Sequence, residues 1–128
     1  MKEMRELVDE RRRRHCMLAK LNLFWHDTLA HMIGFSIIVL GILAPINFLF
    51  PTSQRILNII ILVFSTLALL GETINLRMRF SERFRFYKLR EASYSSFIER
   101  LKQNLFKPED AIREYENIIR GDAELPLQ

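Results

Sequence analysis

Two long apolar stretches, separated by only a few residues, constrain this chain more than any other feature. The first covers residues 28–50 and holds one histidine but no formal charge, and the second is uncharged from Ile56 to Leu70. A helix rises about 1.5 Å per residue, so roughly twenty residues cross a hydrocarbon core of about 30 Å. The sequence therefore predicts two transmembrane helices, at residues 28–50 and 56–76.

A cleaved signal peptide or a soluble helical core would also contain apolar helices, but neither fits this sequence well. The apolar core of a signal peptide is roughly 7 to 15 residues long and follows a short basic region, whereas here a long charged segment precedes a longer stretch. Two buried helices of a soluble protein would need covering on all sides, and a chain of 128 residues has little polar sequence left for this. We interpret both stretches as membrane anchors.

The distribution of basic residues predicts the topology. Residues 1–27 contain seven Lys and Arg, residues 77–107 contain nine, and the connecting loop, residues 51–55 (PTSQR), contains one. Positive charge flanking a membrane span stays cytoplasmic. Both termini are therefore predicted to be cytoplasmic and the loop extracytoplasmic.

The remaining segments are predicted to be helical. Residues 1–27 read as an amphipathic basic helix that runs into the first span, with Met4, Leu7, Leu18, Leu21 and Trp25 on one seam. Residues 77–128 are predicted as a long helix, with no Gly or Pro from Leu76 to Phe106, followed by a second helix at 108–120 and a tail. The predicted fold class is an all-α membrane protein: a two-transmembrane helical hairpin with long cytoplasmic helical extensions.

The long cytoplasmic helix carries an apolar seam at alternating steps of four and three residues. The seam consists of Phe80, Phe84, Tyr87, Tyr94, Ile98, Leu101 and Leu105. Such spacing is typical of helices that pack on other helices. We expect this seam to join copies of the chain or to bind a partner protein.

Catalytic and ligand motifs do not emerge from the sequence. His26 and His31 are five residues apart, so they point about 140° away from each other on a helix and do not converge on one metal ion. A nucleophile with its base, a Gly-rich phosphate loop and paired carboxylates are also not found. Arg11 to Arg14 point in four directions, which suits a diffuse field at an anionic membrane surface better than base recognition. We expect no enzymatic activity, no cofactor, no metal and no specific binding of nucleic acid.

Inside the predicted spans, two sets of residues are candidates for function. Gly34 and Gly41 lie on a stripe of small residues, which predicts a close helix contact, within one hairpin or between subunits. Asn58, Ser65 and Glu72 follow at steps of seven and share one narrow face of the second span. Either this face lines a water-filled path formed by several copies, or Glu72 reaches the headgroups while Asn58 and Ser65 bond across the hairpin.

The whole outline resembles the SLATT domains, two-span membrane modules of bacterial anti-phage and nucleotide-signalling systems. The charged helical lead-in, the short PTSQR hairpin and the cytoplasmic portion with Tyr94 in a long helix carry the resemblance, together with a closing tract of Tyr115, Ile118, Ile119 and Pro126.

The resemblance implies a homo-oligomeric effector of the bacterial inner membrane. Such an effector forms a pore or otherwise breaches the membrane and causes growth arrest or death of an infected cell. A separate protein that makes or senses a nucleotide second messenger would control it. The alternative is a non-conducting scaffold, whose cytoplasmic helices recruit a soluble partner to the bilayer.

Overall fold

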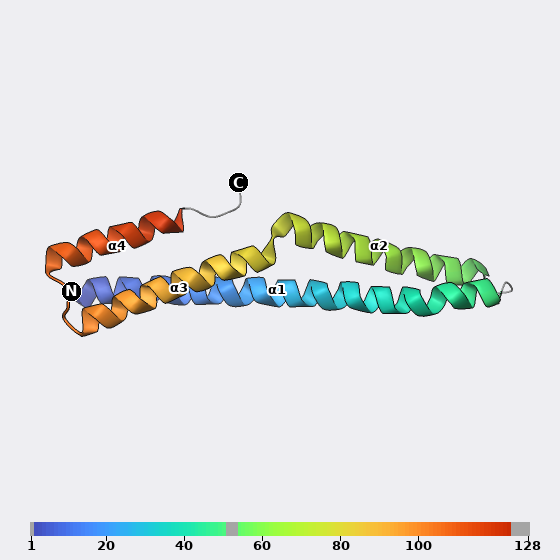
Figure 1. The fold of residues 1–128 in the computed structure, drawn as a ribbon, viewed down its shortest axis with the longest axis horizontal. Coiled ribbons are helices and arrows are strands. Elements are labelled where there is room, and N and C mark those ends of the chain that lie inside the picture. The colour runs from blue at the N-terminus through green and yellow to red at the C-terminus, as the bar shows by residue number, and fades with distance from the viewer. Residues whose placement is uncertain (1, 51–53, 124–128) are drawn as a thin grey trace. The chain divides into compact units, whose positions relative to one another are not determined.

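The computed structural model describes residues 2–50 and 54–123, and this part of the chain is almost entirely helical. It contains α1 (Lys2–Leu49), α2 (Gln54–Met78), α3 (Phe80–Lys102) and α4 (Pro108–Asp122) (Figure 1). The described residues form no strand, which confirms the all-α prediction. Most of the predicted loop, residues 51–53, and the predicted tail at 124–128 lie outside the described residues.

The helices belong to two compact units, and α1 contributes to both. Residues Met1–Leu23 and Phe80–Gln128 form one unit, which we call the head, and Phe24–Arg79 form the other, which we call the hairpin. Each unit has its own internal packing.

The hairpin contains the apolar stretches. Lys2–Leu49 and Gln54–Lys102 each hold a window that is long and apolar enough to cross a membrane, with mean hydropathy of 2.3 and 2.0. Only 6% of each window is buried inside the protein. Long helices that expose apolar side chains on nearly all sides suit lipid rather than water as their surroundings. By length and composition, therefore, two helices of this chain can cross a membrane.

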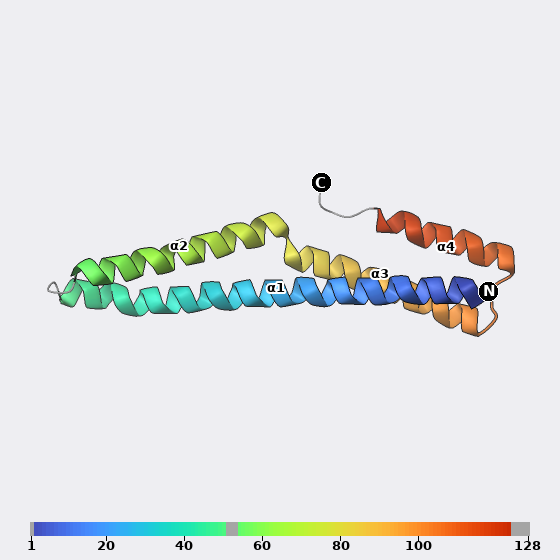
Figure 2. The ribbon, with the colours of Figure 1, turned by 180° about the vertical axis from the view of Figure 1, so that it is seen from behind.

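Within the hairpin, α2 runs back alongside the second half of α1 (Figures 1 and 2). The two helices come close at Gly71, the buried residue of α2. A Cβ atom at this position would lie 2.7 Å from Cε of Met32 and 2.9 Å from Cγ1 of Ile33. Phe35 and Phe64 make an edge-to-face contact at 5.9 Å between ring centroids. The missing side chain of Gly71 thus lets two apolar helices pack closely, as small residues do in membranes.

The predicted long helix is interrupted. Instead of one helix from residue 76 to residue 106, α2 ends at Met78 and α3 begins at Phe80. Between them Arg79 adopts a φ of 47°, a left-handed conformation that few non-glycine residues take. The next helix ends at Lys102, and Asn104 has a φ of 51°.

The buried positions of α2 and α3 do not follow the phase of one continuous helix. Gly71 is buried on α2 and Phe80 is buried on α3, nine residues later. At about 100° per residue, these two positions would lie on opposite faces of one straight helix. No Gly or Pro marks the break at Arg79 in the sequence.

The predicted seam of α1 also differs from the one in the structure. Leu7, Leu21 and Trp25 are exposed, whereas the buried positions of the helix are Val8, His15, Ala19, Asn22, Leu29 and Ser36. The prediction was based on the largest apolar side chains, whereas the buried positions of α1 also include small and polar residues.

The packing at Gly71 generates a stability prediction. Gly71→Leu forces a side chain against Met32 and Ile33, so we expect it to destabilise the hairpin by about 1–3 kcal/mol, the usual cost of overpacking. The matched control is Gly41→Leu, because a Cβ at Gly41 meets nothing within 4 Å. Thermal unfolding in mild detergent, followed by fluorescence of the single tryptophan, Trp25, compares the variants. Equal unfolding temperatures for both would contradict the close contact at Gly71.

Candidate functional site

The predicted oligomer seam forms the core of the head. Tyr94, Ile98 and Leu101 of α3 are buried together with Val8 of α1 and Ala111 of α4. Phe97, which the seam did not include, is also fully buried, with its ring 6.2 Å from that of Tyr115. In contrast, Leu105 is 64% exposed. Most of the seam is therefore covered within the chain, by α1 and by the antiparallel α4 (Figure 1).

A polar cluster fastens the end of α4 to the other helices of the head. The carboxylate of Asp122 accepts a hydrogen bond from Arg90 Nε at 2.7 Å and another from the Tyr94 hydroxyl. Two further basic groups approach it from α1: Arg11 Nη1 at 3.8 Å and His15 Nε2 at 3.5 Å. These five residues, which we call the Asp122 cluster, bring four donors from α1 and α3 to one carboxylate of α4.

His15 is held in this cluster by acceptors on both sides of its ring. Its Nδ1 lies 2.8 Å from the backbone carbonyl oxygen of Arg11, and its Nε2 faces Asp122. The ring also packs between Tyr87 and Tyr94, at 5.8 and 5.3 Å between centroids. Because a carbonyl oxygen only accepts, Nδ1 is the donor in the contact with Arg11. The ring therefore links the backbone of α1 to the carboxylate of Asp122.

Arg90 bridges α3 to the last turn of α4. Besides Asp122, its guanidinium donates to the carbonyl oxygen of Ile118. A Cβ at Gly121 would lie 2.6 Å from Nη1 of Arg90, so a larger residue at this position would have to displace the guanidinium. The last carbonyls of a helix have no partner in the helix and carry partial negative charge, which a guanidinium offsets. Gly121, which the sequence placed after the helix, thus lies inside α4 and makes room for Arg90.

Tyr94 is fully buried at the centre of the cluster. Burial, and then the hydrogen bond to the Asp122 carboxylate, raise the pKa of the Tyr94 hydroxyl far above its ordinary value of 10.0. The hydroxyl therefore stays protonated and remains a donor over the whole physiological range.

Little in the sequence points to this cluster. Arg11 and His15 are four residues apart on one helix, as are Arg90 and Tyr94 on another, while Asp122 is distant from both in sequence. Each pair looks like an ordinary solvated helix face. The one available signal is that Tyr94 lies on the predicted apolar seam although its hydroxyl needs a hydrogen-bond partner when it is buried.

The candidate residues of the hairpin are not brought together by one chain. Asn58 accepts a hydrogen bond from Nδ2 of Asn47 at 2.8 Å, across the hairpin. Ser65 and Glu72 are exposed on its surface. A Cβ at Gly34 or at Gly41 meets nothing within 4 Å, so neither glycine is a close contact inside the hairpin.

The histidines near the start of the first span make only local contacts. His26 Nδ1 lies 3.2 Å from Oδ1 of Asp27, and His31 Nδ1 lies 2.6 Å from the Asp27 carbonyl oxygen. Among residues 2–50 and 54–123, no three His, Cys, Asp or Glu side chains form a group that could hold a metal ion.

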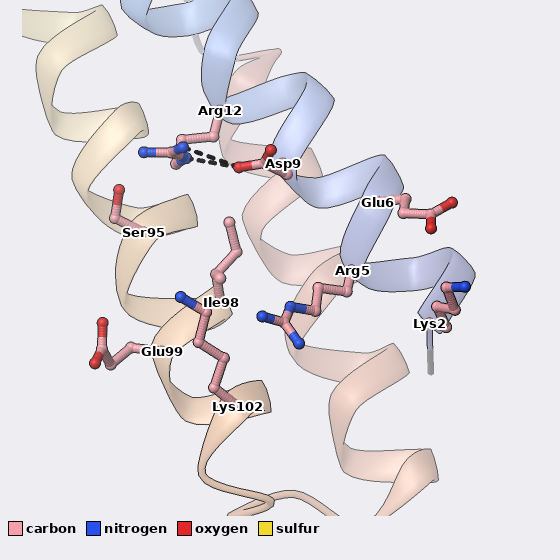
Figure 3. A pocket seen from close by; sticks show the side chains of 9 residues that line it. All are labelled: Lys2, Arg5, Glu6, Asp9, Arg12, Ser95, Ile98, Glu99 and Lys102. Carbon is pink, nitrogen blue, oxygen red and sulfur yellow. Dashed lines mark hydrogen bonds and ion pairs between the residues drawn. The ribbon is translucent and has the colours of Figure 1, made fainter.

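The head also has a surface groove of about 500 Å³ between α1 and α3 (Figure 3). Asp9 is paired there with Arg12 at 2.9 Å, and a hydrogen bond from Arg12 keeps the pKa of Asp9 below its ordinary value. Figure 3 shows Arg5 reaching across the groove towards α3, while Glu6 points away from it. Because basic and acidic side chains both line the groove, its charge favours no single class of ligand.

Comparison with protein-family models, with curated proteins and with solved structures gives no match. The function must therefore be inferred from the geometry of the chain itself. That geometry consists of a membrane-compatible hairpin with exposed polar residues and a head whose last helix is held by one carboxylate.

The protonated state of Tyr94 predicts a loss of stability at high pH. Because its pKa is raised by folding, the stability that it contributes is complete below the ordinary value of 10.0 and is lost as the pH rises beyond it. We expect the unfolding temperature to fall as the pH rises above about 10, and Tyr94→Phe to remove part of this fall. The variant also loses the hydrogen bond to Asp122, so at neutral pH it should be less stable by about 1.5–3 kcal/mol.

Thermal unfolding by far-ultraviolet circular dichroism in detergent measures both effects. Tyr87→Phe is the matched control, since Tyr87 contacts the same histidine but lies half-buried. An unchanged alkaline profile in Tyr94→Phe would contradict the role given to the hydroxyl.

Proposed function

We propose that this chain is a membrane effector that assembles through its hairpin in a bacterial inner membrane and forms a pore or otherwise breaches the bilayer. Growth arrest or death of an infected cell would follow. The observation that carries the proposal is the exposure of Ser65 and Glu72 among the apolar side chains of α2. A separate protein that makes or senses a nucleotide second messenger would control the effector.

A carboxylate on the outer surface of a transmembrane hairpin needs polar surroundings. Exposing an acidic side chain to the centre of a bilayer costs about 2.5–3.5 kcal/mol on insertion scales, and less near the boundary. Two helices enclose no water, so polar surroundings inside the membrane require several copies of the hairpin. Gly34 and Gly41, which contact nothing in their own hairpin, offer surfaces on which a neighbouring helix can approach closely.

A second function, a non-conducting anchor, is favoured by the hydrogen bond between Asn47 and Asn58. Asn58, one of the three residues of the predicted polar face, already accepts a hydrogen bond within the hairpin. If Ser65 and Glu72 only reach polar headgroups, the hairpin would hold the head at the membrane for a soluble partner. A transport measurement separates the two functions.

The charge distribution predicts how single cysteines react in intact cells. On a Cys16→Ser background, which removes the one native cysteine, a membrane-impermeant thiol reagent should label Ser53→Cys but neither Glu3→Cys nor Gln128→Cys. Lysed cells provide the control, because all three cysteines should react there. Labelling of either terminal position in intact cells would overturn the proposed orientation.

The exposed carboxylate predicts cation preference. A ring of Glu72 side chains from several copies would concentrate cations, as acidic rings do in cation channels. Vesicles containing the purified protein should therefore pass cations in preference to anions, and Glu72→Gln should weaken this preference. The matched control, Glu116→Gln, removes an exposed carboxylate from α4 and should leave the preference unchanged.

The transport measurement requires equal amounts of protein and a native mass measurement of each assembly in lipid. If the parent assembles but never conducts, even when cells supply the proposed sensor, the pore is excluded and the anchor function remains. If Glu72→Gln conducts with the selectivity of the parent, the residue does not line the path.

A further inference from the structure

We propose that Arg11, His15, Arg90 and Tyr94 form a binding site for a phosphate group, and that Asp122 occupies this site from within the chain. In this proposal α4 is a displaceable cap, released when a phosphate-bearing ligand replaces the carboxylate. The site lies wholly within the head and does not depend on conduction by the hairpin.

The carboxylate of Asp122 makes short hydrogen bonds with only two of the four donors that surround it. Oδ1 is close to Arg90 at 2.7 Å but 3.5 Å from His15, and Oδ2 accepts from Tyr94 but lies 3.8 Å from Arg11. Two oxygens are thus shared among four donors, and each α1 donor is left with a long contact. A phosphate group has more oxygens, arranged tetrahedrally, so that every donor can have its own acceptor. Guanidinium groups bind phosphate particularly well because their planar donors match its geometry.

The charge of the cluster also favours an incoming anion. Two guanidinium groups face one carboxylate, so the site keeps a surplus of positive charge while Asp122 is bound. A second groove of the head, of about 460 Å³, includes Arg11, His15 and Asp122 in its walls. Arg14 and Glu10 also line this groove, and Arg14 has no ion-pair partner among the described residues. The walls of this groove thus place Arg11, Arg14 and His15 around Asp122, against the single further carboxylate of Glu10.

Displacement of Asp122 would loosen the part of α4 that covers the aromatic core. Its C-terminal end is held by Asp122 and by the contact between Arg90 and the Ile118 carbonyl, both of which use the same guanidinium. Its middle is held by Arg100 and Glu114 at 3.2 Å. A ligand that engages Arg90 therefore competes with both of these contacts, and one that also takes the Tyr94 hydroxyl replaces the other short contact of Asp122. Tyr115 and Ile118, which pack against the buried core, would then be free to lift from it.

Phosphate binding to the full-length protein in detergent tests the site. The probes are inorganic phosphate and pyrophosphate, measured by phosphorus-31 NMR line broadening at constant ionic strength, with chloride and acetate as comparison anions. Asp122→Ala empties the site, so we expect it to bind phosphate more tightly than the parent, by about tenfold or more, the change expected when one charge-assisted hydrogen bond no longer competes. Adding Arg90→Gln to this variant should abolish the gain. Asp110→Ala, which removes an exposed carboxylate from the other end of α4, is the matched control and should bind as the parent does.

Hydrogen exchange of α4 tests the cap. In the parent, phosphate should speed exchange of the amides at 115–122 but not of those in α2, and acetate at equal ionic strength should act more weakly. Asp122→Asn, which preserves the shape of the side chain, should show fast exchange without added anion. Circular dichroism confirms that each variant keeps its helices, and a variant that fails this check is replaced by the other substitution at the same position.

Two sources of phosphate give different results in lipid. If a soluble ligand is the source, α4 exchanges slowly in nanodiscs of neutral and of anionic lipid until phosphate is added. If lipid headgroups are the source, exchange is already fast in phosphatidylglycerol nanodiscs. Equal phosphate binding by the parent, Asp122→Ala and the double variant would overturn the site, and tight binding that leaves α4 exchange unchanged would overturn the cap.

Discussion

One helix, α1, provides the surface on which both units are built, and it does so through a regular repeat. Its buried positions include Val8, His15, Asn22, Leu29 and Ser36, which recur at steps of seven residues. A repeat of seven keeps one stripe of a helix turned towards its partners over many turns. The first positions pack in the head and the last in the hairpin, so the same stripe is buried in an aromatic core and in a membrane-compatible one.

The polar side chains of this stripe form hydrogen bonds with the backbone of α1 itself. Asn22 donates to the carbonyl oxygen of Leu18 at 2.7 Å, and Ser36 donates to that of Met32 at 2.8 Å, four residues earlier in each case. The contact of His15 with the Arg11 carbonyl has the same spacing. A buried polar group costs little when a hydrogen bond compensates it, and here the helix itself supplies the acceptor. Neighbouring helices can therefore pack closely against these small or polar side chains and need not supply hydrogen-bond partners for them.

The sequence is informative where one physical signal dominates. Long uncharged runs locate the two apolar helices, and Pro108 locates the start of α4. The sequence is less informative where local and distant contacts compete. The apolar seam from Phe80 to Leu101 reads as a surface for another chain because the covering residues, Val8 and Ala111, lie far away in sequence. The break at Arg79 could not be foreseen either, since no helix-breaking residue marks it.

The two carboxylates Asp122 and Glu72 show where the chain depends on something outside itself. Asp122 is surrounded by donors from α1 and α3, so the negative charge of this carboxylate is compensated within the head. Glu72 is exposed beside apolar side chains, and within the described residues no ion pair or hydrogen bond reaches it. The head has also covered most of its apolar seam, whereas the hairpin exposes apolar side chains on nearly all sides. We therefore propose contacts with lipid and with further copies of the chain for the hairpin, and contacts with a soluble ligand for the head.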